Sequence, residues 1–123
     1  MSARILLFLA AAAVVVSAFA ADWSFEYRPA AVKYAIYGGG LGDPVAPSKK
    51  EAKITFEVTG SAAKDIFDSI GPDKKDQCSS DSADRFRSKD ADKLTCTLSP
   101  SGEYTCYFGF DLKSGKSTGG SIC

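Results

Sequence analysis

The sequence contains no histidine and no asparagine. Without histidine, the chain cannot form a Ser-His-Asp or Cys-His catalytic centre, a histidine-ligated zinc site or a histidine-based pH switch. Without asparagine, it has no acceptor for N-linked glycans. An excess of charge is also missing, because 15 Lys and Arg balance 15 Asp and Glu. Nucleic acids and anionic membranes attract strongly basic proteins, so neither is expected as a partner.

Long hydrophobic runs are missing except at the N-terminus. Arg4 precedes an apolar run over residues 5–16, and residues 18–20 supply the small side chains that a signal peptidase recognises. This pattern predicts a signal peptide over residues 1–20 and a single exported domain over residues 21–123. The run is short for a membrane-spanning helix, and no basic stop-transfer residues follow it. We therefore expect a periplasmic or secreted protein, with no membrane attachment in its mature form.

Cysteine is absent from the first half of the chain, and all four cysteines lie in the second half: Cys78, Cys96, Cys106 and Cys123. An even number of cysteines in an exported domain is typical of disulfides, so two are expected. Zinc sites built from four cysteines usually contain Cys-x₂-Cys pairs, whereas no two cysteines here are closer than ten positions. The sequence therefore predicts neither a metal nor another cofactor.

The hydrophobic pattern predicts a mixed domain of strands and one helix. Apolar and polar residues alternate, as in half-buried strands, over residues 22–28, 32–37, 53–59, 94–98, 104–112 and 117–122. An apolar stripe with a period of about four predicts a short amphipathic helix over residues 61–70, with Ser61 as its N-cap. The polar residues 73–92 are expected to form a surface segment, within which residues 85–89 could form a strand. The fold class expected is α+β, with an antiparallel sheet of five to six strands, the helix packed on one face, and two disulfides.

Turn residues near the C-terminus suggest how the cysteines pair. If Pro100-Ser101-Gly102 forms a three-residue hairpin loop, Cys96 lies opposite Cys106, at a distance that suits a disulfide. Cys78 then pairs with Cys123. Alternatively, a two-residue turn at residues 114–115 places Cys106 opposite Cys123, and Cys78 then pairs with Cys96.

Two segments are candidates for binding. The first is a loop of glycines and prolines between two predicted strands, because loops on a braced scaffold often carry recognition. Its candidate residues are Tyr37, Gly38, Gly39, Gly40, Leu41 and Asp43; the alternative is that the loop only connects two strands. The second segment contains Arg85 and Arg87, which share one face if the chain is extended and could hold a carboxylate or phosphate. The alternative is an edge strand whose charge prevents aggregation.

Catalysis without histidine would require two carboxylates facing each other. The candidates on predicted strands are Glu26, Glu57, Glu103 and Asp111, and nothing in the sequence pairs any two of them. The sequence therefore predicts a non-catalytic exported binding protein, whose partner is another exported or envelope protein. The size, leader and cysteine usage are shared by many bacterial periplasmic inhibitors and immunity proteins. The alternatives are a small secreted hydrolase that uses carboxylates and a structural protein of the cell envelope.

Overall fold

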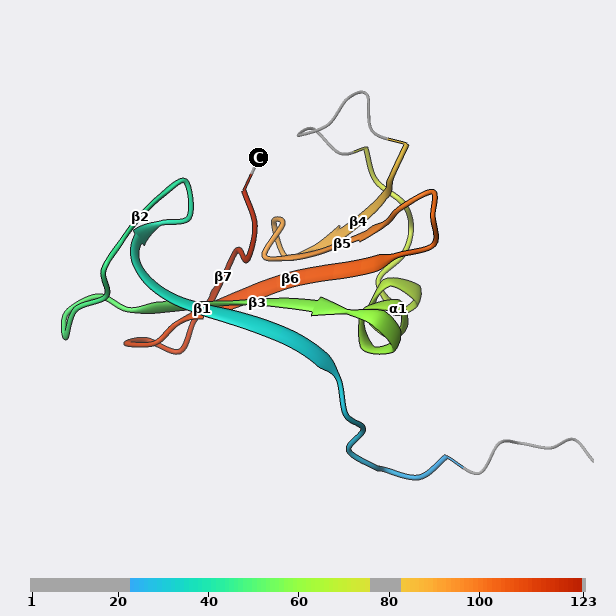
Figure 1. The fold of residues 1–123 in the computed structure, drawn as a ribbon, viewed down its shortest axis with the longest axis horizontal. Helices are drawn as coiled ribbons and strands as arrows, with labels where there is room; N and C mark the ends of the chain where they lie inside the picture. The colour runs from blue at the N-terminus through green and yellow to red at the C-terminus, as the bar shows by residue number, and fades with distance from the viewer. Residues whose placement is uncertain (1–22, 76–82, 123) are drawn as a thin grey trace, which may run out of the picture.

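The computed structural model describes residues 23–75 and 83–122, which form an antiparallel sheet with one helix on one face (Figure 1). The predicted signal peptide, Cys78 and Cys123 lie outside the described residues. Within the described ranges there are seven strands: β1 (Ala31–Gly40), β2 (Asp43–Val45), β3 (Lys53–Thr59), β4 (Arg85–Lys89), β5 (Leu94–Leu98), β6 (Tyr104–Asp111) and β7 (Ser117–Thr118). The helix is α1 (Gly60–Ser69). The expected α+β class is thus confirmed, with more strands than the five to six expected.

The strands follow the order β2-β1-β3-β6-β5-β4, and every neighbouring pair is antiparallel. The long strand β6 is central, because it pairs with β3 on one side and with both β5 and β7 on the other. The strand expected over residues 117–122 is shorter than predicted, since only β7 pairs. No helix in the described part of the chain is long and apolar enough to cross a membrane.

The helix α1 follows β3 directly and packs against β6, β3 and β5. Its predicted apolar stripe is confirmed, because Ala63 and Phe67 are fully buried and Ile66 and Ile70 pack beside them. The predicted N-cap was wrong. Thr59 is the N-cap residue without a side-chain hydrogen bond, and Ser61 lies in the first turn. The helix begins one residue early because Gly60, with a φ of 71°, can turn the chain directly out of β3.

The buried core lies where α1 crosses the sheet. It contains Val58 from β3, Cys106 from β6 and Cys96 from β5, together with Ala63 and Phe67 from the helix. These sheet residues are consecutive members of one row across three strands, since Val58 lies opposite Cys106, and Cys106 lies opposite Cys96. The core therefore occupies one part of one face of the sheet.

The predicted hairpin between β5 and β6 is confirmed. The amide of Ser99 donates to the carbonyl of Glu103 at 2.9 Å, and Gly102 has the positive φ of 88° that the loop requires. This register places Cys96 opposite Cys106, and the two form a disulfide. The alternative register that joined Cys106 to Cys123 was therefore wrong. The Cys78–Cys123 pairing involves residues outside the described ranges and stays a prediction.

Two sequence predictions near the N-terminus were wrong. Residues 23–28 form no strand, and Trp23, Phe25 and Tyr27 are exposed, because no strand of the described chain pairs with this segment. The glycine- and proline-rich segment over residues 38–50, which was expected to be a loop, is not wholly one, since β1 continues through Gly40 and pairs with β2. The three consecutive glycines let β1 bend here, with Gly39 at a φ of 70°, and an edge strand tolerates Pro44.

The C-terminal segment lies on the face opposite α1. Thr55 Oγ1 on β3 donates to the carbonyl of Gly120 at 2.8 Å, and the hydroxyls of Thr95 and Ser121 lie 3.1 Å apart. A Cβ atom at Gly120 would overlap the backbone of Phe108. The segment thus passes so close to β6 that only glycine fits.

The disulfide between β5 and β6 should contribute strongly to stability, because both sulfur atoms are buried and the core around them is small. We predict that Cys96→Ala/Cys106→Ala lowers the free energy of unfolding by about 2–4 kcal/mol. Urea denaturation of the purified protein measures this value. An unchanged urea midpoint in the double variant would contradict this prediction. Non-reducing peptide mapping of the wild-type protein separately shows whether Cys78 is joined to Cys123.

Candidate functional site

A large part of the face that carries α1 is apolar and is not covered by any helix of the described residues. Alternate residues of β1, β3 and β6 point to this side, and we call the following set the apolar face: Val32, Tyr34, Ile36, Ile54, Phe56, Phe108 and Phe110. Tyr34 is 68% exposed and Phe110 is 37% exposed. Contiguous exposed apolar surface of this kind commonly marks an interaction site.

The strand register arranges the apolar face in rows. Ile36, Ile54 and Phe110 form one row across β1, β3 and β6. Tyr34, Phe56 and Phe108 form the next row, in which the two phenylalanine rings are 5.3 Å apart. Because each row belongs to a hydrogen-bonded sheet, the face is rigid and can bind without a large ordering cost.

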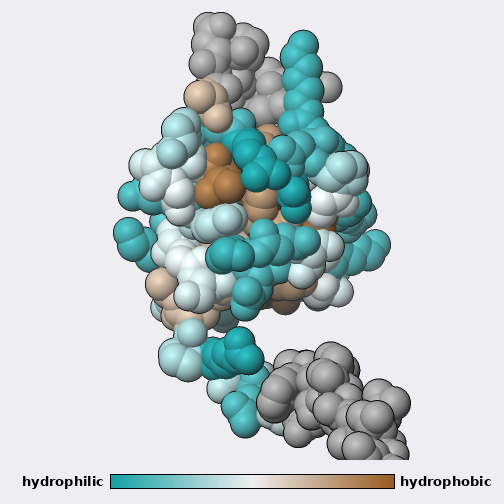
Figure 2. All heavy atoms as spheres, turned by 90° about the vertical axis from the view of Figure 1, so that its right-hand side faces the viewer, coloured by the Kyte–Doolittle hydropathy of each residue, from teal (hydrophilic) through white to brown (hydrophobic). Residues whose placement is uncertain are grey.

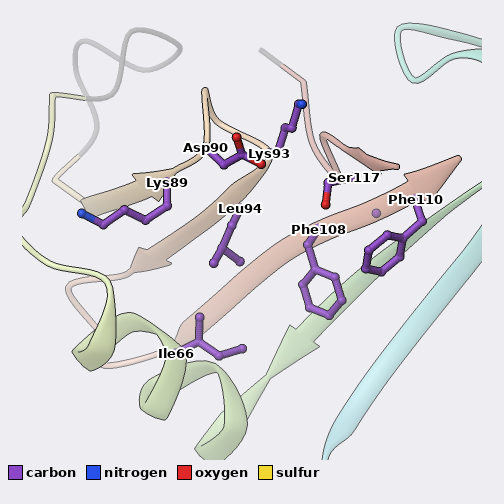
Figure 3. A pocket seen from close by; sticks show the side chains of 9 residues that line it. Ile66, Lys89, Asp90, Lys93, Leu94, Phe108, Phe110 and Ser117 are labelled. Atoms are coloured by element: carbon purple, nitrogen blue, oxygen red, sulfur yellow. The ribbon is translucent and has the colours of Figure 1, made fainter. Parts of the chain in front are cut away.

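A groove of about 400 Å³ joins the apolar face to the helix. Figure 3 shows Ile66 from α1, Leu94 from β5, and Phe108 and Phe110 from β6 around a common space. In contrast, the end of the molecule where α1 lies shows mainly hydrophilic surface with small hydrophobic patches (Figure 2). The helix therefore covers its own end of the sheet, and the groove marks where that cover stops.

The rim of the groove is charged, with two lysines and Asp90. Lys89 and Lys93 line it, and neither forms an ion pair with any residue in the described ranges. Between them, Asp90, Ala91 and Asp92 all have φ between 51° and 62°, a region that residues other than glycine seldom adopt. Such outliers cluster at functional sites, so this turn is a second reason to place a site here.

The two predicted arginines hold a carboxylate of their own chain. Arg85 Nε donates to Asp73 at 2.8 Å, and Arg87 Nε donates to the same carboxylate at 2.7 Å. These hydrogen bonds, first that from Arg85 and second that from Arg87 in size of effect, lower the pKa of Asp73 from 3.8 to about 2. Arg87 also lies over the ring of Phe67, 4.2 Å from its centroid. The arginines thus brace α1, and β4 is an edge strand, as the alternative interpretation expected.

The predicted binding loop is held in place by charged side chains. Gly39 N–H donates to Glu51 at 2.8 Å, and Lys53 Nζ donates to the Gly39 carbonyl at 2.6 Å. Lys53 and the Gly39 amide lower the pKa of Glu51. Tyr37 is only 6% exposed, so the expectation that its side chain is an accessible anchor was wrong. Binding by the remaining residues of this loop stays a prediction; they are Gly38, Gly39, Gly40, Leu41 and Asp43.

The candidate carboxylates lie apart from one another. Glu57 on β3 accepts a hydrogen bond of 3.0 Å from Tyr107. The pKa of Tyr107 is raised mainly by its burial and also by this hydrogen bond. Asp111 ends β6 and accepts from the amides of residues 113 and 114, which lowers its pKa. Glu103 lies in the β5–β6 hairpin loop, and Glu26 precedes β1. Within the described ranges, no group of acidic residues or cysteines could hold a metal ion.

Comparison with protein-family models, with curated proteins and with solved structures finds no match to this chain. The apolar face is therefore argued from its geometry alone. The sequence contained a signal for it, because apolar residues alternate on all three strands. The shortness of the helix, which leaves them uncovered, is a property of the packed fold.

The ion pairs of Asp73 should make stability depend on pH. Because the folded pKa lies below its ordinary value, the stabilisation is present above about pH 3.8 and is lost as the pH falls through about 2. We predict that Asp73→Asn lowers the urea midpoint at pH 7 and that the difference from wild type closes by about pH 2. Asp43→Asn, at an exposed position on β2, is the control and should leave the urea midpoint unchanged both at pH 7 and at about pH 2.

The two tyrosines of β1 should differ sharply in their effect on stability. We predict that Tyr37→Ala lowers the free energy of unfolding by about 3 kcal/mol, because the side chain is buried. Tyr34→Ala on the same strand should change it by less than about 0.5 kcal/mol, because Tyr34 is exposed. Urea denaturation of both variants provides the measurement, and equal losses would contradict the burial of Tyr37.

Proposed function

We propose that this chain is a non-catalytic exported binding protein that recognises another exported or envelope protein through the apolar face. The observation that carries the proposal is the exposure of rigid apolar rows on a sheet whose only described helix covers one end. Aromatic side chains on such a surface provide contact area at a low cost in conformational entropy. The disulfide between β5 and β6 is typical of proteins outside the cytosol.

The partner is expected to carry an apolar ridge with carboxylates at one end. The ridge would lie along the rows of the apolar face and enter the groove beside Phe108 and Phe110. The carboxylates would then meet Lys89 and Lys93, the cations on the rim without ion-pair partners in the described chain. Inhibition of an envelope hydrolase is one form that this binding can take.

Phe110 is the best position at which to test the proposal, because it belongs to both the apolar face and the groove. We predict that Phe110→Ala weakens partner binding by about 1–3 kcal/mol, or about 5–150-fold in Kd. Partners would be captured from envelope extract on the immobilised mature protein, and their affinities measured by calorimetry. Thermal unfolding of the variant shows whether the fold is kept.

The control is Ile122→Ala, which truncates an exposed apolar residue of the C-terminal segment, on the other side of the sheet. A partner of the apolar face should bind this variant as it binds wild type. If every captured protein binds the Phe110 and Ile122 variants equally well, the proposal is wrong.

A further inference from the structure

The outer edge of β1 has no partner strand along most of its length. β3 pairs with one side of β1 from Ala31 to Tyr37, and β2 pairs with the other side only from Gly38 to Gly40. In the described chain, the outer side of residues 31–37 is therefore an open edge. Exposed edges are usually blunted by charge, as β4 is by its two arginines and a lysine. Lys33 is the only charged residue of the open edge.

The segment just before β1 has the pattern of a strand but pairs with no strand among residues 23–75 and 83–122. The rings of Phe25 and Tyr27 contact each other at 5.2 Å on one side of the chain. Ser24 and Glu26 contact each other at 3.3 Å, as alternate residues of an extended chain do. Trp23, Phe25 and Tyr27 are all highly exposed, and Figure 1 shows the segment leading away from the sheet. Residues 23–28 are thus extended and aromatic on one side.

One antiparallel register fits this segment to the open edge. With Arg28 opposite Ala31, the three aromatic residues come opposite three members of the apolar face: Tyr27 opposite Val32, Phe25 opposite Tyr34, and Trp23 opposite Ile36. Each apolar row would then gain an aromatic residue, and such cross-strand pairs are favourable. In the same register Glu26 lies opposite Lys33, which pairs opposite charges.

The turn favoured for such a hairpin is closed to the segment on its own chain. Arg28 opposite Ala31 leaves Pro29-Ala30 as a two-residue turn, and the favoured two-residue turns need a positive φ at their first residue. Proline is fixed near −65°. A second copy of the chain has no such restriction.

We propose that two copies of this chain form a dimer in which residues 23–28 of each copy add as a strand to the open edge of β1 in the other. The exchange is reciprocal, so no open edge remains between residues 31 and 36 in either copy. This inference goes beyond the proposed function, because the dimer forms without any other partner.

The exported, processed protein should have twice its chain mass by light scattering, and removal of residues 21–28 should give the monomer mass. Trp23 is the only tryptophan, so its fluorescence should shift to the blue as the protein concentration rises. A protein that is monomeric at every concentration up to about 1 mM would overturn the proposal. A dimer that survives removal of the segment would also overturn it.

Paired cysteines test the register directly. Ser24→Cys/Ala35→Cys places the new cysteines opposite each other and should give a reducible species of twice the chain mass. The matched control, Ser24→Cys/Ala31→Cys, is four residues out of register and should not. If the first pair joins residues within one chain, the segment folds back on its own β1 and the proposal is wrong.

The turn residues provide an independent test. Pro29→Asn/Ala30→Gly introduces the dipeptide favoured in two-residue hairpin turns. In this background the protein should become a monomer, and Ser24→Cys/Ala35→Cys should now join residues within one chain. A dimer of unchanged stability would show that Pro29 does not direct the segment to a second copy. These experiments contain no other partner, so their failure leaves the Phe110 test unaffected.

Discussion

The packing of one short helix on the sheet is the constraint on which the rest of this structure depends. A helix of ten residues is about 15 Å long and about 10 Å wide, which is enough to cover roughly two strand spacings. On the side of the helix, the sheet presents five neighbouring strands, in the order β1-β3-β6-β5-β4. The helix therefore fully buries only the row that contains Val58, Cys106 and Cys96, and the apolar residues beyond this row stay partly exposed to solvent.

A core of this size needs further support, and the residues around Phe67 provide it. The disulfide crosses two strands directly beneath the helix. Arg87 lies over the Phe67 ring and donates to the Phe67 carbonyl at 2.8 Å, near the C-terminal end of α1, where cations are favourable. Asp73 then fixes Arg87 and Arg85 together. The basic residues that the sequence offered as an anion site thus act as part of the scaffold.

Local patterns in the sequence predicted most of the fold, because strands, the helix and the β5–β6 hairpin depend on neighbouring residues. The hairpin is the clearest case, since Gly102 fixed the loop and the loop fixed the disulfide register. The strand predicted over residues 23–28 does not form, because an alternating pattern does not by itself supply a partner strand. The prediction for Tyr37 failed because its side chain is buried, and burial is set by the packed fold rather than by the neighbouring residues. The alternation of apolar residues on its strands indicated the apolar face, but its exposure could not be predicted, since that depends on where the helix ends.

The uncovered face and the open edge meet on β1, and they involve different parts of that strand. Val32, Tyr34 and Ile36 direct side chains toward the apolar face, whereas the open edge offers main-chain amides and carbonyls in the plane of the sheet. A strand added at the edge leaves the side chains of the face accessible and lengthens its rows. Recognition of another protein by the face and pairing of two copies at the edge are therefore compatible, and the second would present two apolar faces in one assembly.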